Sequence, residues 1–298
     1  MDDKGTLTLD ALLPRDMAAR AESVGVAKVT LGTYRVFALA VLAGAFISMG
    51  AIFATAVTAG GQGLPIGLVR LIGGTAFSLG LILVIVAGAE LFTGNNLIIM
   101  AWASGKVTSA QLFGNWAVVY AGNFVGAAMT AVIMFLSEEY LLAGGAIGLN
   151  ALTIAQAKTT LDFLPALLLG VFCNTLVCLA VWLCLSARST TDKILSIVPP
   201  IAAFVAAGFE HSIANMYFIL IALLIKTGAP AGFWAQIGRT AADFPSLTWE
   251  RFLIGNLLPV TIGNVIGGTI MVGLVYWFIY LRPNWTGRSP DVRPPAEP

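Results

Sequence analysis

The stretches "AGAELFTGN" (residues 87–95) and "AGFEHSIAN" (residues 207–215) decide the fold. Each lies inside a long apolar run, and the two match at four places, so that Glu90 corresponds to Glu210 and Asn95 to Asn215. Carboxylates are rare inside apolar membrane segments because they are costly to bury there. Their recurrence at equivalent positions predicts a duplicated chain in which two helices are interrupted.

The composition of the chain predicts an integral membrane protein. Of 298 residues, 58% are hydrophobic and 10% are charged, which is too apolar for a soluble domain of this length. The net charge of +1 provides no field for nucleic acid, so no nucleic-acid partner is expected. The three cysteines share one apolar segment at spacings that match no metal motif, so no metal site is expected and the cysteines are predicted to fill space in reduced form.

Six apolar runs reach the roughly 20 residues that a membrane-spanning helix needs. They lie near 35–57, 68–104, 110–137, 161–186, 194–226 and 252–281. The second and fifth runs are too long for straight spanning helices, and each carries one of the two repeated polar inserts. We therefore expect an all-α integral membrane protein with six transmembrane helices, of which helices 2 and 5 are broken.

The other runs also repeat. The third contains "GNWAVVYAGNFVG" from Gly114 and the sixth contains "GNLLPVTIGNVIG" from Gly255. The first and fourth agree more weakly, as "ALAVLAGAF" from Ala38 and "LPALLLGVF" from Leu164. Three spans per half is an odd number, so the second half must enter the membrane inverted, which predicts a pathway between two inverted three-helix repeats. The repeated glycines suit close helix packing.

The predicted organisation has five parts. They are an N-terminal arm (1–33), a first repeat (34–137), an extracytoplasmic loop (138–160), a second repeat (161–281) and a C-terminal tail (282–298). The arm has no continuous apolar core and does not read as a cleaved signal peptide. With both termini on one side, that side carries 11 Lys and Arg residues and the other carries five, so both termini are predicted to be cytoplasmic.

Glu90 and Glu210 are predicted to be architectural. At a helix break the second half-helix presents unpaired N–H groups, which an adjacent carboxylate can cap. Asn123 and Asn264, in the repeated GN motifs, are expected either to pack between helices or to line the pore, because an amide in lipid needs a partner.

His211 is the only histidine, and its counterpart in the first half is Leu91. A residue without an equivalent in the other half is expected to have a functional role and not a role in the duplicated scaffold. The structural alternative is a buried histidine whose hydrogen bonds are all made within the protein. In an apolar pore the ring can stay neutral when empty and share or donate a proton when an anion arrives. Thr93 and Asn96 in the opposite break offer a hydroxyl and an amide, which suit a small polar solute.

Several of these motifs resemble the formate/nitrite transporter family. They are "AELFTG", "GFEHSIAN", "NWAVVYAGNFVGA", "LLPVTIGN" and the arm "LLPRDMAARAESVGVAK", which together cover nearly the whole chain. The resemblance implies an aquaporin-like protomer in a homopentamer of the bacterial inner membrane, with one pore per protomer and no cofactor.

The resemblance also implies roles for particular residues. The central histidine of the family falls on His211 and the threonine of its Ω-shaped break on Thr93. Its hydrophobic constrictions fall on Phe77 with Leu81 and on Phe204, and its anion-attracting basic residue falls on Lys158. Its polar pore positions fall on Asn174, Asn215 and Asn264. The residues "TGNN" from Thr93 are more polar than in typical formate members.

The implied function is transport of small weak-acid anions, with formate as the first candidate and with nitrite, acetate and hydrosulfide as competitors. Lys158 would draw the anion in, His211 would supply a proton, and the neutral acid would cross the apolar slit. Gated channel and proton-coupled carrier both stay open. An amphipathic arm, through Met17, Ala21 and Val24, is expected to plug the cytoplasmic mouth at low pH.

Proteins of other classes fit the sequence less well. An electron-transfer subunit would need two axial histidines for haem, and only one histidine is present. A water or glycerol channel would carry paired Asn-Pro-Ala motifs, which are absent from the sequence. A purely structural anchor would not need mirrored breaks, and no enzymatic activity is expected.

Overall fold

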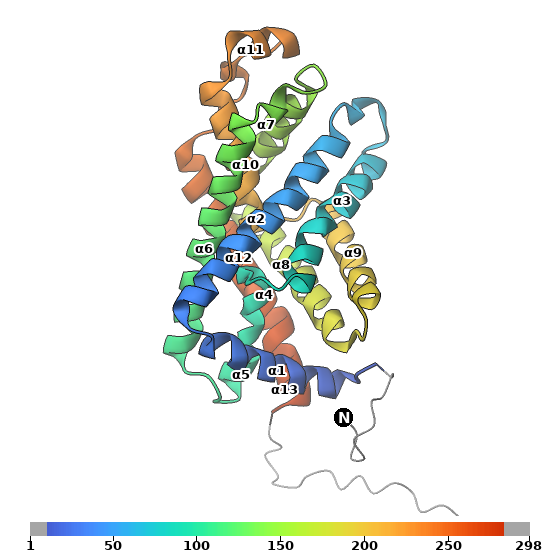
Figure 1. The fold of residues 1–298 in the computed structure, drawn as a ribbon, viewed down its shortest axis with the longest axis vertical. Coiled ribbons are helices and arrows are strands. Elements are labelled where there is room, and N and C mark those ends of the chain that lie inside the picture. The colour runs from blue at the N-terminus through green and yellow to red at the C-terminus, as the bar shows by residue number, and fades with distance from the viewer. Residues whose placement is uncertain (1–10, 283–298) are drawn as a thin grey trace, which may run out of the picture.

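The computed structural model describes residues 11–282, and within them it is entirely helical (Figure 1). The α-helices are α1 (Pro14–Thr30), α2 (Thr33–Thr58), α3 (Ile66–Val86), α4 (Phe92–Asn95), α5 (Ile99–Ala103), α6 (Ser109–Leu136), α7 (Ala146–Thr159), α8 (Phe163–Ser186), α9 (Thr190–Ala207), α10 (Ser212–Gly228), α11 (Ala231–Ile237), α12 (Leu258–Ile266) and α13 (Val275–Tyr280). Short 3-10 turns lie at Gly61–Gly63, Asn96–Ile98, Glu139–Leu141 and Ala241–Asp243. π-Helical segments at Arg251–Leu257 and Gly267–Leu274 join α12 to its neighbours.

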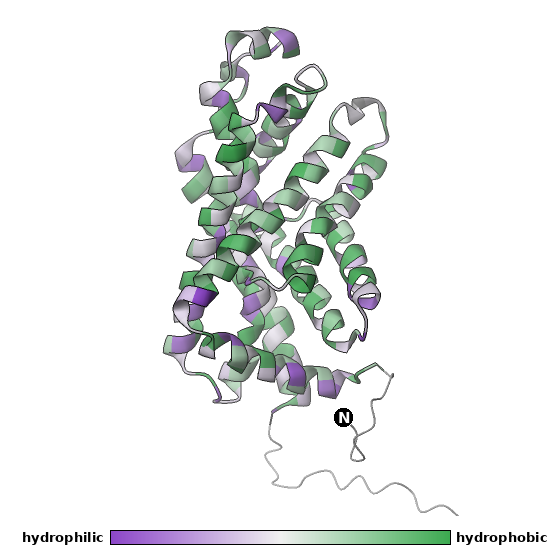
Figure 2. Cartoon of the chain, viewed as in Figure 1, coloured by the Kyte–Doolittle hydropathy of each residue, from purple (hydrophilic) through white to green (hydrophobic). Residues whose placement is uncertain are grey.

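Six helices in the described part of the chain are long and apolar enough to cross a membrane. They are Thr33–Thr58, Ile66–Val86, Ser109–Leu136, Phe163–Ser186, Thr190–Ala207 and the continuous run Arg251–Tyr280. Apolar residues cover most of these helices, whereas hydrophilic residues are frequent on α1 (Figure 2). Each predicted run overlaps one of the six helices, and the chain is a multi-pass membrane protein.

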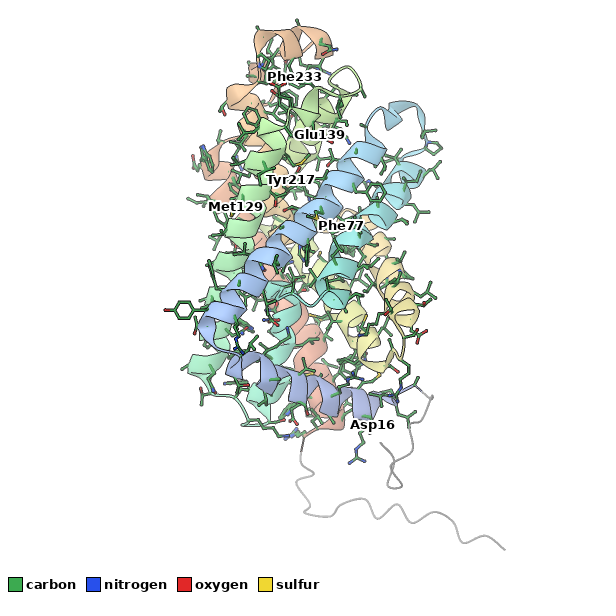
Figure 3. All side chains as sticks on the ribbon, in the orientation of Figure 1. Asp16, Phe77, Met129, Glu139, Tyr217 and Phe233 are labelled. Atoms are coloured by element: carbon green, nitrogen blue, oxygen red, sulfur yellow. The ribbon has the colours of Figure 1, made fainter. Side chains whose placement is uncertain are left out.

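The two ends of the molecule are marked by α1 and α11, and we call them the α1 face and the α11 face. Asp16 of α1 lies at one end and Phe233 lies at the other (Figure 3). α10 and α11 meet at an angle of 110° at a short break, so that α11 turns away from the helix that precedes it.

Helices 2 and 5 are broken where the repeated inserts lie, as predicted. α3 ends at Val86 and α4 begins at Phe92, while α9 ends at Ala207 and α10 begins at Ser212. Gly88 and Gly208 adopt φ values of 83° and 77°, in the left-handed region that favours glycine. The shared Ala-Gly pair of the two inserts therefore ends one half-helix and turns the chain toward the next.

Asparagines of the repeated GN motifs hold each break. The Asn123 amide donates to the carbonyls of Ala40 at 2.7 Å and Glu90 at 2.9 Å, and its oxygen accepts from the N–H of Phe92 at 2.9 Å. Asn264 makes the equivalent bonds to Gly170 at 2.8 Å, Glu210 at 2.9 Å and the N–H of Ser212 at 2.9 Å. Both side chains are fully buried, and these bonds between helices occupy both their amide and their oxygen.

These bonds correct one sequence alignment. The N–H of Glu90 donates to the carbonyl of Leu39, and that of Glu210 donates to Leu169. Leu39 therefore corresponds to Leu169. The alignment that starts at Ala38 and Leu164 instead pairs Leu39 with Pro165, which lies four residues before Leu169. The error is about one helical turn, which leaves the apolar pattern almost unchanged and so escapes detection by composition.

Glycines let the mirrored helix pairs touch through their backbones. A Cβ at Gly126 of α6 would collide with the carbonyl of Val41 in α2, and a Cβ at Gly267 would collide with that of Val171 in α8. Small residues at these crossings are what close packing in a membrane requires, because no solvent drives the helices together.

α1 lies across the α1 face of the bundle (Figure 1). It buries Met17 and Ala21, but Val24 is 38% exposed and Gly25 is buried in its place. The amphipathic face is therefore rotated from the predicted one. The Arg20 guanidinium donates to the Leu185 carbonyl at 3.0 Å, which anchors the helix against α8.

Candidate functional site

The two breaks bring Thr93 and His211 together at the centre of the molecule. Thr93 Oγ1 and His211 Nε2 are 3.0 Å apart, and the residues are 0% and 3% exposed. Each residue sits beside the first turn of the half-helix that follows its break, so the backbone holds both side chains at the interface between the halves.

The hydrogen bonds of His211 define its tautomer. The N–H of Ala214 donates to Nδ1 at 3.1 Å, so the ring serves as the N-cap of α10 and Nδ1 carries no proton. The single proton of the neutral ring then lies on Nε2 and points to Thr93 Oγ1. To donate a proton and stay neutral, the ring must take up another at Nδ1, which requires release of the Ala214 N–H.

Aromatic rings cover this pair on the side of the α11 face. Phe204 stacks near His211 with ring centroids 6.1 Å apart, and Phe77 meets Phe204 edge-on at 5.7 Å. Phe77 also stacks on Phe218 at 6.2 Å. The sequence placed Phe77 with Leu81 in one constriction, whereas the ring contacts join Phe77 to Phe204.

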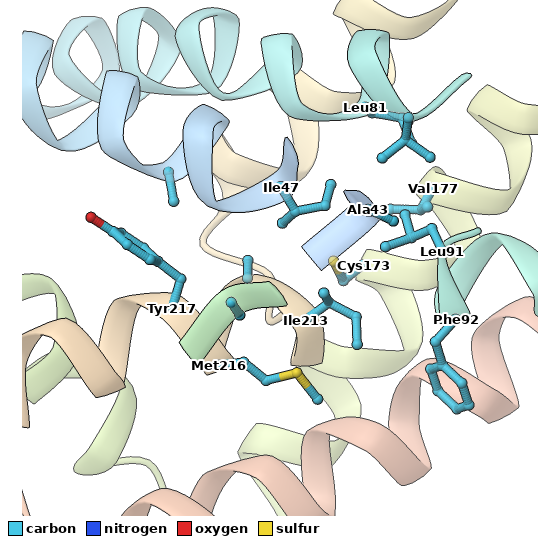
Figure 4. Packing of buried hydrophobic residues seen from close by; sticks show 14 of the residues in the cluster. Ala43, Ile47, Leu81, Leu91, Phe92, Cys173, Val177, Ile213, Met216 and Tyr217 are labelled. Atoms are coloured by element: carbon cyan, nitrogen blue, oxygen red, sulfur yellow. The ribbon is translucent and has the colours of Figure 1, made fainter. Parts of the chain in front are cut away.

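Leu81 belongs to the same buried hydrophobic cluster as Phe77 and Phe204. It is 2% exposed and lies in the same buried cluster as Leu91 and Val177 (Figure 4). Leu91 is the repeat counterpart of His211 and was not predicted to lie in this cluster. The match between the two inserts could have predicted it, because that match places Leu91 at the position equivalent to His211.

A cavity of about 420 Å³ lies above the aromatic rings, and we call it the vestibule. Its lining includes Phe77, Phe204 and His211 together with the charged residues Arg70, Lys158 and Glu210. Asn150, Asn215 and Phe218 also line it. The vestibule thus reaches the predicted site histidine.

Each break carries a buried cluster of one lysine, one glutamate and two asparagines. Lys158 Nζ donates to Glu210 Oε1 at 2.9 Å, and the Asn215 amide donates to Glu210 Oε2 at 2.6 Å and to Asn256 Oδ1 at 2.8 Å. These bonds neutralise the carboxylate in the apolar interior, where an unpaired charge would be strongly unfavourable.

The first half repeats this cluster with Lys28 of the arm. Lys28 Nζ donates to Glu90 Oε1 at 2.7 Å, and the Asn95 amide donates to Glu90 Oε2 at 2.6 Å and to Asn115 Oδ1 at 2.9 Å. Lys28 lies eleven residues before Leu39, and Lys158 lies eleven residues before Leu169. Lys28 was not predicted to pair with Glu90, because it lies in the polar arm, outside the apolar runs in which the repeat is visible.

The glutamates do not cap the half-helices, contrary to the expectation from sequence. Their carboxylates accept from lysine and asparagine side chains, while the N–H groups of Phe92 and Ser212 are capped by Asn123 and Asn264. An asparagine from a neighbouring helix can donate and accept at once, which lets it bind both sides of a break.

Asn174 lies behind Thr93. Its amide donates to Asn96 Oδ1 at 2.7 Å, to the Asn264 carbonyl at 2.6 Å and, more weakly, to the Thr93 carbonyl at 3.3 Å. Asn174 and Asn96 are fully buried, and Asn96 Nδ2 has no hydrogen-bond partner among the described residues. Both side chains therefore support the first break, and neither lines the vestibule.

Comparison with known proteins agrees with this architecture. A family model described as Formate/nitrite transporter matches residues 15–278. The "Formate channel FocA" of Escherichia coli (strain K12) is 49% identical over 275 residues, which cover 92% of this chain and 96% of the relative. The "Probable formate transporter" of Methanothermobacter thermautotrophicus is 36% identical and is covered over 97% of its length.

Solved structures are similar as well. A structure described as "Pentameric formate channel with formate bound" superimposes with a TM-score of 0.80 at 48% identity, covering 84% of this chain and 98% of the other. An "FNT family ion channel" superimposes with a TM-score of 0.76 at 28% identity, covering 89% and 98%.

The inverted repeats, the broken spans and the central polar pair define a membrane transport protein. The chain belongs to the formate/nitrite transporter family.

Proposed function

We propose that this protein transports formate across the membrane through a pore in each protomer of a homopentamer. Relatives described as formate channels cover nearly the whole chain, and a structural relative is described as pentameric with formate bound. The observation that carries the proposal is the Thr93–His211 pair beneath a vestibule that contains two cationic side chains. Transport, and not an enzymatic reaction, is the activity that this arrangement suits.

In the proposed mechanism, the cationic side chains of the vestibule, Arg70 and Lys158, attract the anion, and His211 Nε2–H meets it in place of Thr93. Charge is unfavourable between the aromatic rings, so passage is easiest once the anion becomes the neutral acid. The proton lost from Nε2 is replaced at Nδ1, with release of the Ala214 N–H. This leaves the ring as the Nδ1–H tautomer. The site would return to its starting state once Nδ1 gives up its proton and Nε2 takes one up from water in the vestibule, so that the Ala214 N–H again donates to Nδ1.

We further propose that the α1 face is cytoplasmic and that the protein resides in the bacterial inner membrane. The excess of Lys and Arg on the side of both termini supports this orientation. We propose to keep the divisions of the chain at residues 33, 137, 160 and 281 with one change. α1 and α7 are each assigned to the repeat that follows them, because Lys28 and Lys158 bind the equivalent glutamates of the two breaks.

The role of His211 can be tested by uptake into proteoliposomes. His211→Asn keeps an oxygen that can cap the Ala214 N–H but removes the titratable ring, whereas His211→Phe removes both. We expect the Asn variant to fold normally and to lose pH-dependent formate uptake. Unchanged uptake and an unchanged pH profile would contradict proton transfer at His211. Competition by nitrite, acetate and hydrosulfide would rank the substrates.

A further inference from the structure

Arg70 contributes an unbalanced positive charge to the vestibule. The cavity lining contains three charged side chains, and two of them, Lys158 and Glu210, form an ion pair at 2.9 Å. The ion pairs found among residues 11–282 do not include Arg70. An anion that enters the cavity therefore meets a net charge of +1, and Arg70 is its source.

The guanidinium of Arg70 is held close to the second break. Arg70 lies in the second turn of α3, and its Nη1 donates to the carbonyl of Ala206 at a long 3.4 Å. A Cβ at Gly208 would lie 3.7 Å from the same nitrogen, so the group extends over the turn that leads to His211. Because a guanidinium has five N–H donors, most of its donors stay available to a ligand.

Arg70 also breaks the internal symmetry. It lies seventeen residues before Ala87, and the residue seventeen positions before Ala207 is Thr190. The lysines of the two break clusters, Lys28 and Lys158, are equivalent, but Arg70 has no equivalent in the other half. His211 likewise has no equivalent histidine, because Leu91 stands in its place. An unduplicated charge at one mouth is not required by the scaffold.

We infer that Arg70 is an anion-binding residue of the vestibule. Its guanidinium binds a small monocarboxylate or another two-oxygen anion before that anion reaches the phenylalanine rings. The planar fork of a guanidinium matches the two oxygens of a carboxylate, whereas it gains less from a single-atom anion such as hydrosulfide. Arg70 thus adds selectivity as well as attraction. The inference rests on the proposed transport of formate.

The test compares Arg70→Gln, Arg70→Lys and the wild-type chain in proteoliposomes, with formate and hydrosulfide as substrates. Arg239→Gln is the matched control, because Arg239 is an exposed arginine of the same face that does not line the cavity. We expect Arg70→Gln to raise the apparent KM for formate about 3- to 10-fold at low ionic strength, with a smaller effect in high salt. The maximal rate should stay within about twofold, since no contact in the pore is lost.

Arg70→Lys should recover the charge but not the fork, so it should favour hydrosulfide relative to formate more than the wild type does. A formate KM that is unchanged in Arg70→Gln, in a wild type that transports formate, would overturn the inference and leave the proposed function intact. A wild type that transports no formate would overturn both. Gel filtration and thermal melting of each variant exclude misfolding as the cause.

Discussion

The hydroxyl groups of Tyr120 and Thr261 hydrogen-bond to each other at 2.9 Å, although they occupy equivalent positions in the two halves. Tyr120 lies three residues before Asn123, and Thr261 lies three residues before Asn264. Two equivalent residues of an inverted repeat can touch only where the pseudo-twofold axis passes between them. This bond therefore joins the halves at their axis.

Removal of this bond should destabilise the protein modestly. Tyr120→Phe and Thr261→Val should each cost about 1 kcal/mol, the usual net value of a hydrogen bond between neutral groups. The double variant should cost little more than either single one, because both remove the same interaction. Thermal unfolding in detergent measures the cycle, and fully additive effects would show that the two hydroxyls act independently.

Asn264 should contribute more to stability than Tyr120. Asn264→Ala leaves the N–H of Ser212 and the carbonyls of Gly170 and Glu210 without their partner. At roughly 1 kcal/mol or more for each buried unpaired group, we expect a loss of about 3 kcal/mol in the free energy of unfolding. Asn123→Ala should behave alike, and a loss below that of Tyr120→Phe would contradict the role of these asparagines.

Gly268→Ala should impair transport by displacing the support of Thr93. An added Cβ would lie 2.5 Å from Asn174 Nδ2, 2.8 Å from Asn96 Cβ and 2.9 Å from Cys178 Sγ. We expect formate flux to fall about tenfold or more, corresponding to roughly 1.4 kcal/mol in the barrier.

The control for this variant lies in the first half, where Ala127 is the equivalent residue one position after Gly126. Ala127→Gly should cost only the roughly 1 kcal/mol typical of glycine in a helix and should leave the flux unchanged. Normal flux in Gly268→Ala would show that the Asn96–Asn174 contact does not position the site.

Lys28→Met should loosen α1 from the bundle. The change leaves Glu90, whose side chain is only 10% exposed, without its cation. Breaking a buried pair on one side costs about 3 kcal/mol or more, while removing both charges costs less. We expect faster proteolysis near α1 in Lys28→Met and recovery in Lys28→Met with Glu90→Gln.

Lys106→Met is the comparison for Lys28→Met. It breaks the ion pair between Lys106 and Glu22, in which the lysine side chain is 55% exposed. The Glu22 side chain is 8% exposed, as buried as that of Glu90, but water reaches the lysine side of this pair, so the variant should be cleaved near α1 less readily than Lys28→Met. Equal sensitivity of the two variants would show that α1 is not held by the buried cluster at Glu90.

Much of the architecture could be predicted from the sequence. The six spans, the two breaks and the duplication follow from hydropathy and from the matching inserts, because lipid demands long apolar helices and tolerates a polar break only where something satisfies it. His211 could be predicted as a site residue because the equivalent position in the first half holds no histidine. The repeat phase of the first and fourth spans could not be predicted, since a shift of one helical turn preserves the apolar pattern.

The sequence by itself determined where the chain crosses the membrane and where its helices break, because both depend on local polarity and on glycine. Only the tertiary structure decided which groups satisfy those breaks. The capping asparagines come from distant helices, Lys28 comes from the arm, and Arg70 approaches the second break from the other half of the repeat. Such partners are chosen by three-dimensional proximity, which residue spacing along one helix does not encode.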